Sequence, residues 1–283
     1  MPEAEHINPR AEDVYAGARR IPTASLSTDI GFVFALHQEA VGILDRLKHS
    51  RKTRGNGQTF HTGTIGDLSI AVILSGVGQN NAEAATKILT EVFEPKLVCS
   101  VGYAGGLSSR LKQFNICVPE QVLRASDGSA LDLSSLVPQT TLPMPDKLTL
   151  ITVNEVVELP EQKWTLHEQT GAEIVDMETF AVADVCRTRN IPFCSIRIIL
   201  DAAGDRIPKD IAKILDNMDK GVSRFSGTIF GSILSRPSVV LDLVSLKQRA
   251  FTATERLAQF ALKELQQRRD TPPVEKLTIA SFS

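Results

Sequence analysis

The sequence lacks a strong net charge, a long apolar run and a leader-like opening. Its 283 residues carry 31 basic and 33 acidic side chains, which gives a formal net charge of -2. This balance provides no attraction to nucleic acid or to an anionic membrane surface. The longest apolar runs have the length of strands, so we expect no stable membrane insertion. No basic stretch followed by an apolar one opens the chain, and we expect a cytoplasmic protein.

The sequence also lacks any cysteine motif. Its four cysteines are Cys99, Cys117, Cys186 and Cys194, and they form no CxxC pair. They fall in strand-like or helix-like segments with no histidine partner nearby. We therefore expect buried, reduced thiols and no metal site.

What the chain does have, from residue 30 onward, is an alternation of strand-like and helix-like segments. The runs "IGFVFAL" and "SIRIILD" predict buried strands, whereas the spacing of Val41, Leu44 and Leu47 predicts a helix within residues 38–50. Such alternation favours an α/β fold, namely a single three-layer domain with a central mixed β-sheet flanked by helices. Ligands in such folds bind beyond the carboxyl ends of the strands.

The composition divides the chain into four parts. We expect a polar N-terminal extension over residues 1–28, an α/β domain over 29–235, amphipathic helices over 236–271 and a loose tail over 272–283. The helices would cover the sheet or a dimer partner. Leu241 and Val244 are three residues apart and so share a helix face, and replacing both with Asp should break a dimer that uses it.

Two glycine-containing segments follow buried strands. In "SGVGQNNAEAA", Gly76 and Gly78 stand where a dinucleotide-binding loop would start, but the third glycine of that fingerprint is missing. A tight strand-to-helix turn is the simpler interpretation. The segment "SVGYAGGL", residues 100–107, predicts a turn whose backbone N–H groups approach a ligand closely.

Three carboxylates lie at the ends of predicted strands. Asp201 ends the strand Ser195–Asp201, Glu178 opens a helix directly after a strand, and Glu39 follows the first apolar strand. Each has a structural alternative, because an acidic side chain in a first helical turn is favourable without any function.

The order of these segments carries a resemblance. The strand before Glu39, "SGVGQNNAEAATKI", "EPKLVCSVGYAGGL", "EIVDMETFAVADVCRTRNIPF" and "SIRIILDAAGD" together resemble the nucleoside phosphorylase and nucleosidase superfamily, over about residues 29–215. The spacing from Glu178 to Asp201 is similar to that of the methylthioadenosine/S-adenosylhomocysteine nucleosidases. The C-terminal part looks like the hopanoid-associated phosphorylase branch. The resemblance implies cleavage of the N-glycosidic bond of a purine nucleoside, with a 5′-modified adenosine as the expected substrate, and a homodimer.

The resemblance also implies residue roles. Asp201 would protonate the purine N7, helped by desolvation that favours its protonated form. Glu39 would activate the attacking water, and Glu178 would bind the ribose hydroxyls. The remaining substrate-binding candidates are Met177, which would pack on the sugar, and Gly102, Tyr103, Ala104, Gly105, Val175 and Gly78 in the pocket wall.

The sequence departs from that family at several points. Leu200 stands where a hydroxyl residue is usual, Tyr103 replaces a small residue, and the segment 126–150 is too short for the usual base-covering loop. The strand ends offer no arginine for phosphate, so His37, Arg206 or Arg110 would have to bind it.

Hydrolysis is therefore favoured. Phosphorolysis of an adenosylhopane-type nucleoside remains an alternative, with phosphate as co-substrate and no other cofactor. A nucleoside-binding module without turnover is the other alternative.

Overall fold

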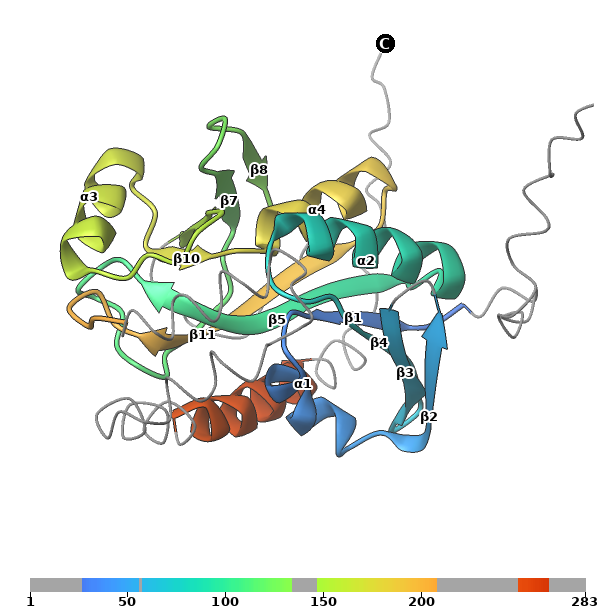
Figure 1. Ribbon diagram of the computed structural model, residues 1–283. Coiled ribbons are helices and arrows are strands. Elements are labelled where there is room, and N and C mark those ends of the chain that lie inside the picture. Colours follow the sequence, from blue (N-terminus) through green and yellow to red (C-terminus); the bar gives the residue numbers. More distant parts are fainter. Residues whose placement is uncertain (1–26, 56–57, 134–146, 208–248, 265–283) are drawn as a thin grey trace, which may run out of the picture.

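The computed structural model describes residues 27–55, 58–133, 147–207 and 249–264. These residues form an 11-stranded sheet with helices on both faces (Figure 1). The strands are β1 Ile30–Phe34, β2 Lys48–Gly55, β3 Gln58–Ile65, β4 Leu68–Leu74, β5 Leu97–Gly106, β6 Ile116–Cys117, β7 Gln121–Arg124, β8 Ala130–Asp132, β9 Thr149–Thr152, β10 Ile174–Asp176 and β11 Phe193–Asp201. The helices are α1 His37–Leu44, α2 Gln79–Phe93, α3 Pro160–Thr170 and α4 Thr179–Thr188, with a further helix over residues 249–264.

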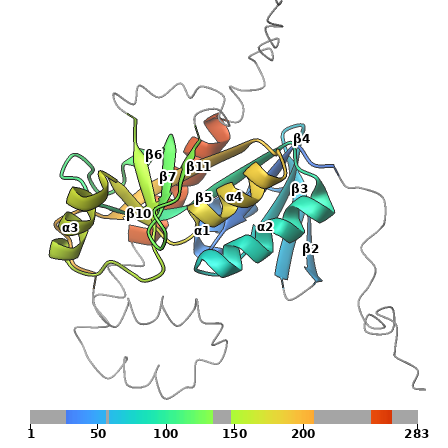
Figure 2. The same cartoon turned by 90° about the horizontal axis from the view of Figure 1, so that it is seen from above.

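The sheet is mixed, which confirms the predicted fold class. Its strand order is β2-β3-β4-β1-β5-β10-β9-β7-β8, and β11 pairs with β5 and β6. Strands β1 and β11 run parallel to β5, whereas β10 runs antiparallel to it. Helices α2 and α4 cover one face, and α1 and the helix 249–264 cover the other (Figure 1). Helix α3 lies at the end of the sheet away from β2, β3 and β4 (Figure 2).

Each face of the sheet has its own apolar core. Leu89 of α2 and Val182 of α4 belong to one cluster, while Ile43 of α1 and Leu257 of the helix 249–264 belong to the other. Apolar side chains at helical spacing account for both, because burial removes their surface from water.

The four cysteines are buried, as their strand-like and helix-like surroundings predicted. Cys99 and Cys194 sit opposite each other on β5 and β11, with their Sγ atoms 3.0 Å apart. None of the helices in the described ranges is long and apolar enough to cross a membrane.

The predicted helix over residues 38–50 was too long. Helix α1 ends at Leu44, and Lys48–Gly55 form strand β2. This strand pairs only with β3 within the described sheet, so it is an edge strand whose side chains are largely exposed. An edge strand that faces solvent needs no alternation of apolar and polar residues. The charged run "KHSRKTRG" therefore carried no strand pattern.

The predicted turn at "YAGG" was also wrong. Residues 103–106 continue strand β5, because β11 pairs beside them as far as Gly105. Helix α3 was not predicted at all. The predicted short segment 126–150 contains strand β8, which pairs with β7, and its residues 134–146 lie outside the described part.

Several predictions concern residues that the structure does not describe. These are most of the N-terminal extension, the helices before residue 249 with Leu241 and Val244, and the tail. The described helix 249–264 falls within the predicted amphipathic stretch and has the predicted type.

Candidate active site

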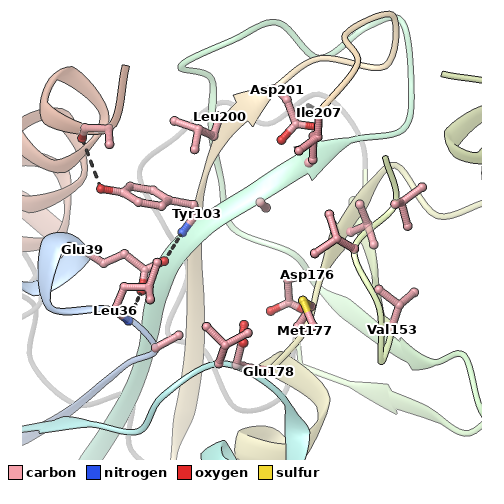
Figure 3. A pocket seen from close by; sticks show the side chains of 18 of the residues that line it. Leu36, Glu39, Tyr103, Val153, Asp176, Met177, Glu178, Leu200, Asp201 and Ile207 are labelled. Carbon is pink, nitrogen blue, oxygen red and sulfur yellow. Dashed lines mark hydrogen bonds between the residues drawn. The ribbon is translucent and has the colours of Figure 1, made fainter. Parts of the chain in front are cut away.

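A cavity of about 330 Å³ opens beside the second half of β5 (Figure 3). Helix α1, strands β5, β10 and β11 and the helix 249–264 all contribute residues to it. Its lining residues are Ala35, Leu36, Gln38, Glu39, Val77, Tyr103, Ala104, Gly105, Val153, Val156, Val157, Val175, Asp176, Met177, Glu178, Leu200, Asp201, Arg206, Ile207, Arg249 and Ala250.

The cavity exists because the sheet divides along one edge of β5. Strand β11 pairs with β5 along most of its length. On the other edge, β1 pairs only as far as Ser100, and β10 pairs only with Gly105 and Gly106. Between them the N–H of Tyr103 donates to a side chain, Oε1 of Glu39, at 2.8 Å. The break in pairing therefore places a carboxylate against the middle of the sheet.

Glu39 is held by two backbone N–H groups. Its Oε2 accepts the N–H of Leu36 at 2.8 Å, as the acidic half of a capping box at the start of α1. Burial raises its pKa, and the N–H groups of Tyr103 and Leu36 oppose that rise. A carboxyl with a raised pKa is a stronger base once ionised, which suits proton abstraction from water.

Gly102 makes room for this carboxylate. A Cβ atom at Gly102 would lie 2.7 Å from Oε1 of Glu39, closer than atoms of this kind approach each other. The sequence analysis assigned Gly102 to a turn near the ligand. Its role in the structure is to let Glu39 approach the strand.

Arg197 is a buried cation next to Glu39 and Glu178. Its Nε and Nη2 donate to Oδ2 of Asp176 at 3.1 and 3.0 Å, and Nη2 also donates to the hydroxyls of Ser100 and Thr179, both at 2.7 Å. Its charge therefore has a dedicated partner inside the protein. Arg197 lies within the run "SIRIILD", and the sequence analysis assigned it no role.

Glu178 is held by a backbone N–H group at the start of α2. Its Oε1 accepts the N–H of Gly78 at 2.7 Å, and Gly78 has a φ of 93°, which favours glycine. Burial, and then the negative charge of Asp176, raise the pKa of Glu178 to about 8. At neutral pH this side chain retains its proton and can both donate and accept hydrogen bonds.

A second, small cavity of about 10 Å³ adjoins the first next to Glu39. Its polar lining comes from Glu39, Ser75, Ser100, Glu178 and Arg197. A space of this size with several polar partners accommodates about one water molecule.

Asp201 lies across the main cavity from Glu39 and Glu178 (Figure 3). The register of β11 against β5 shifts between Ile199 and Asp201, and this irregularity turns the Asp201 side chain toward Gly105. Burial raises the pKa of Asp201, and the ammonium of Lys163 opposes that rise. Lys163, on α3, is its ion-pair partner.

The remaining wall is largely apolar. Its side chains include Leu36, Val153, Val156, Val157, Leu200 and Ile207. The hydroxyl of Tyr103 hydrogen-bonds Thr254 at 2.7 Å and donates to the carbonyl of Ala250 at 3.2 Å. The phenol thus points toward the helix 249–264 (Figure 3), so its bulk is directed away from Glu39.

Most of the predicted site residues meet in this cavity. Those that line it are Asp201, Glu39, Glu178, Met177, Tyr103, Ala104, Gly105, Val175 and Arg206. Gly102 lines the small cavity. Gly78 contributes indirectly, because its N–H group donates to Glu178. His37 belongs to neither lining, and Arg110 forms an ion pair with Glu173.

The sequence analysis missed Asp176, Arg197 and Lys163 as site residues. A charged residue inside an apolar strand was a usable signal for Arg197, because a buried charge needs a partner. Asp176, the partner of Arg197 in the structure, stands only two residues before Glu178 in the sequence. Lys163 gave no signal, since the segment that contains it was not assigned to any element.

The comparisons with known proteins identify the family of this fold. Residues 29–149 and 148–233 match the family model of the Phosphorylase superfamily. Because the match spans more than half of the chain, the protein belongs to the phosphorylase superfamily. This confirms the predicted superfamily and, at this level, the predicted enzyme class.

Individual relatives are more distant. The chain is 26% identical over 219 residues to the 5'-methylthioadenosine/S-adenosylhomocysteine nucleosidase of Oceanobacillus iheyensis. This alignment covers 69% of this chain and 95% of the relative. It is 28% identical over 201 residues to the enzyme of the same name from Halalkalibacterium halodurans, covering 62% and 87%.

Solved structures share the fold. The Campylobacter jejuni 5'-methylthioadenosine/S-adenosyl homocysteine nucleosidase superimposes with a TM-score of 0.64 at 16% identity, covering 85% of this chain and 100% of that one. The futalosine hydrolase of Helicobacter pylori gives 0.63 at 20% identity, covering 84% and 97%.

Proposed function

We propose that the protein hydrolyses the N-glycosidic bond of a purine nucleoside, with a 5′-modified adenosine as its substrate. The observation that carries this proposal is the arrangement of Glu39 and Glu178 on one side of the cavity and Asp201 on the other. Relatives named as nucleosidases support it.

The proposed reaction assigns one task to each carboxyl. Asp201, in its protonated form, gives a proton to N7 of the base while the bond from C1′ to the base breaks and its electrons pass to the base. A water molecule beside Glu39 attacks C1′ and gives its proton to Glu39. Glu178 binds the ribose hydroxyls, and Met177 packs on the sugar. Solvent then takes the proton from Glu39 and restores the one on Asp201, so the net reaction consumes one water.

Water is favoured over phosphate as the nucleophile. The small cavity next to Glu39 fits about one water molecule and is too small for phosphate. Its cation, Arg197, already pairs with Asp176, and the acidic Glu39 and Glu178 side chains border the same space. In its ionised form, which the proposed role as a base requires, Glu39 would repel a phosphate dianion there, and this disfavours phosphorolysis.

The substrate's 5′ group is proposed from the lining. The apolar side chains Leu36, Val156, Val157 and Ile207 favour an uncharged, apolar substituent at that position. The reaction needs only water and the three carboxyls, so we propose no cofactor. A homodimer is our proposed assembly, and light scattering at micromolar concentration would test it.

The test is release of free adenine from methylthioadenosine, S-adenosylhomocysteine, 5′-deoxyadenosine and adenosine, each with and without phosphate. We expect release without phosphate from at least one 5′-modified substrate. Release that requires phosphate would contradict hydrolysis, and silence on the whole panel would contradict the proposed substrate class.

The Asp201→Asn variant provides the mechanistic arm. General acid catalysis contributes about 10²–10⁴-fold, so we expect turnover to fall by that range while ligand affinity changes little. Asp127→Asn, at an exposed carboxylate in the β7–β8 hairpin, is the matched control. Unchanged turnover in Asp201→Asn would remove Asp201 from the mechanism.

A further inference from the structure

Helix α3 buries its lysine and exposes its tryptophan. Lys163 is 0% exposed, whereas its neighbour Trp164 is 66% exposed. The hydrophobic effect alone would favour the reverse, because burying an ammonium group is costly unless it is paired and hydrogen-bonded. A specific set of contacts must therefore keep Lys163 inside.

All three donors of the Lys163 ammonium group reach the end of β11. Its Nζ lies 2.5 Å from Oδ2 of Asp201 and 2.9 Å from the carbonyl oxygens of both Ala202 and Asp205. An ammonium group has three N–H donors, so these contacts use all of them. Oδ2 of Asp205 also accepts the N–H of Ala202 at 2.9 Å, which closes the turn. Lys163 thus ties α3 to the strand end and to the turn that follows it.

The contact matters because Asp201 has few other supports. The pairing register shifts just before Asp201, so the ladder with β5 does not fix its side chain by itself. Leu200 beside it has no hydroxyl to offer. Its carboxyl is only 16% exposed, and Lys163 binds Oδ2. Among the described residues, Oδ1 is the oxygen left to face a ligand in the cavity.

Resting on the proposed function, we propose that Lys163 is a positioning residue that orients the Asp201 carboxyl toward the leaving purine. It holds one carboxyl oxygen and the turn 202–205, so that the other oxygen points at the base. The same contact places a positive charge next to the group that carries the reacting proton.

The positive charge of Lys163 predicts a change in the pH profile, which a loss of stability alone would not produce. Within the described part of the chain, the charged groups around Asp201 are Lys163, Asp205 and Arg249, and Arg206 lines the same cavity. Lys163 stabilises the ionised form of Asp201, so removing its charge raises the pKa of Asp201 further. Because the protonated form is the active one, the alkaline limb of the pH profile then moves to higher pH.

The first experiment compares wild type with Lys163→Met on a substrate that the wild type cleaves. We expect kcat to fall about 100-fold at neutral pH, as for a displaced catalytic group, and the alkaline limb of kcat/KM to move up. Lys87→Met is the control and should match wild type. Lys87 pairs with Glu83 on the solvent-facing side of α2, away from the cavity. A Lys163→Met variant with wild-type kcat, or with an unshifted alkaline limb, would overturn the inference.

Chemical rescue provides a second readout. Ethylamine added to Lys163→Ala should restore part of kcat, because a small amine can occupy the buried space beside Asp201. A merely structural lysine would show no dependence on ethylamine concentration. If Lys163→Met does not fold, Lys163→Gln replaces it in the pH experiment, since it too lacks the charge.

The outcomes separate this inference from the proposed function. If the wild type cleaves nothing on the panel, the proposed function fails and the inference with it. If the wild type cleaves and Asp201→Asn does not, while Lys163→Met behaves like Lys87→Met, only the inference fails.

Discussion

Glu178 is a carboxyl that holds its proton at neutral pH because the protein buries it beside Asp176. Its pKa is about 8 in the folded chain against an ordinary 4.5. Between these two values the native state keeps a proton that the unfolded chain releases. The free energy of unfolding therefore falls as pH rises through this window.

The Glu178→Gln variant should remove this pH dependence. We expect its stability relative to wild type to rise steadily between about pH 4.5 and 8 and to level off above, because Gln has no proton to lose. Urea denaturation across that range measures it. Glu83→Gln, at a half-exposed site on α2, should run parallel to wild type. Parallel curves for Glu178→Gln would show that Glu178 titrates normally.

The sequence could predict the acids of the site but not their partners. Glu39, Glu178 and Asp201 each stand at or just after the end of an apolar run, so their place at strand ends followed from local pattern. Lys163 is 38 residues from Asp201 in the chain, and no local pattern links them. Pairings of this kind depend on tertiary packing, which periodicity does not encode.

At the scale of elements, the continuity of β5 determines the shape of the site. The segment 103–106 has three small residues and suggests a turn, yet the partner strand β11 keeps it extended. Gly105, where a Cβ atom would lie 3.0 Å from Cγ1 of Val175, therefore serves close approach rather than chain reversal.

Two glycines of β5 should respond very differently to alanine. Gly102→Ala places a methyl group 2.7 Å from Oε1 of Glu39, so the carboxylate must move and turnover should fall by about 100-fold. Gly106→Ala meets its nearest atom, Cγ2 of Ile199, at 3.4 Å and should be nearly silent. Steady-state kinetics of both variants on one substrate provide the measurement. Equal activities would mean that Glu39 has no fixed position in catalysis.

The errors at element scale share a cause. Strand β2 was taken for the end of a helix because Val41, Leu44 and Leu47 are helically spaced, although only the first two lie in α1. Helix α3 was missed because its buried residue is a lysine and its large apolar residue is exposed. Where an element faces solvent or buries a charge, hydrophobic periodicity no longer reports its type.

At the scale of the whole molecule, the helix 249–264 joins the end of the described chain to its beginning. Thr254 donates to the carbonyl of Gln38, and a Cβ on Gly42 would lie 2.6 Å from that of Ala258. The helix also contributes Arg249 and Ala250 to the cavity. The site is therefore complete only when distant segments have packed together.

Leu257→Ala tests how much this helix contributes. Leu257 is 1% exposed, and truncating such a side chain costs about 2–5 kcal/mol in free energy of unfolding. Phe251→Ala, 72% exposed on the same helix, should stay within about 0.5 kcal/mol of wild type. Urea denaturation of both variants gives the comparison. A small loss for Leu257→Ala would mean that the helix packs loosely.

The four buried thiols supply native reporters of partial opening. An alkylating reagent reaches a buried cysteine only when the surrounding structure opens, so the rate of modification measures the free energy of that opening. Three different parts of the fold are sampled, by Cys186 on α4, by Cys117 on the short strand β6, and by the Cys99 and Cys194 pair on β5 and β11. Mass spectrometry of a labelling time course would therefore rank these parts of the protein by the free energy of local opening, with no engineered cysteine.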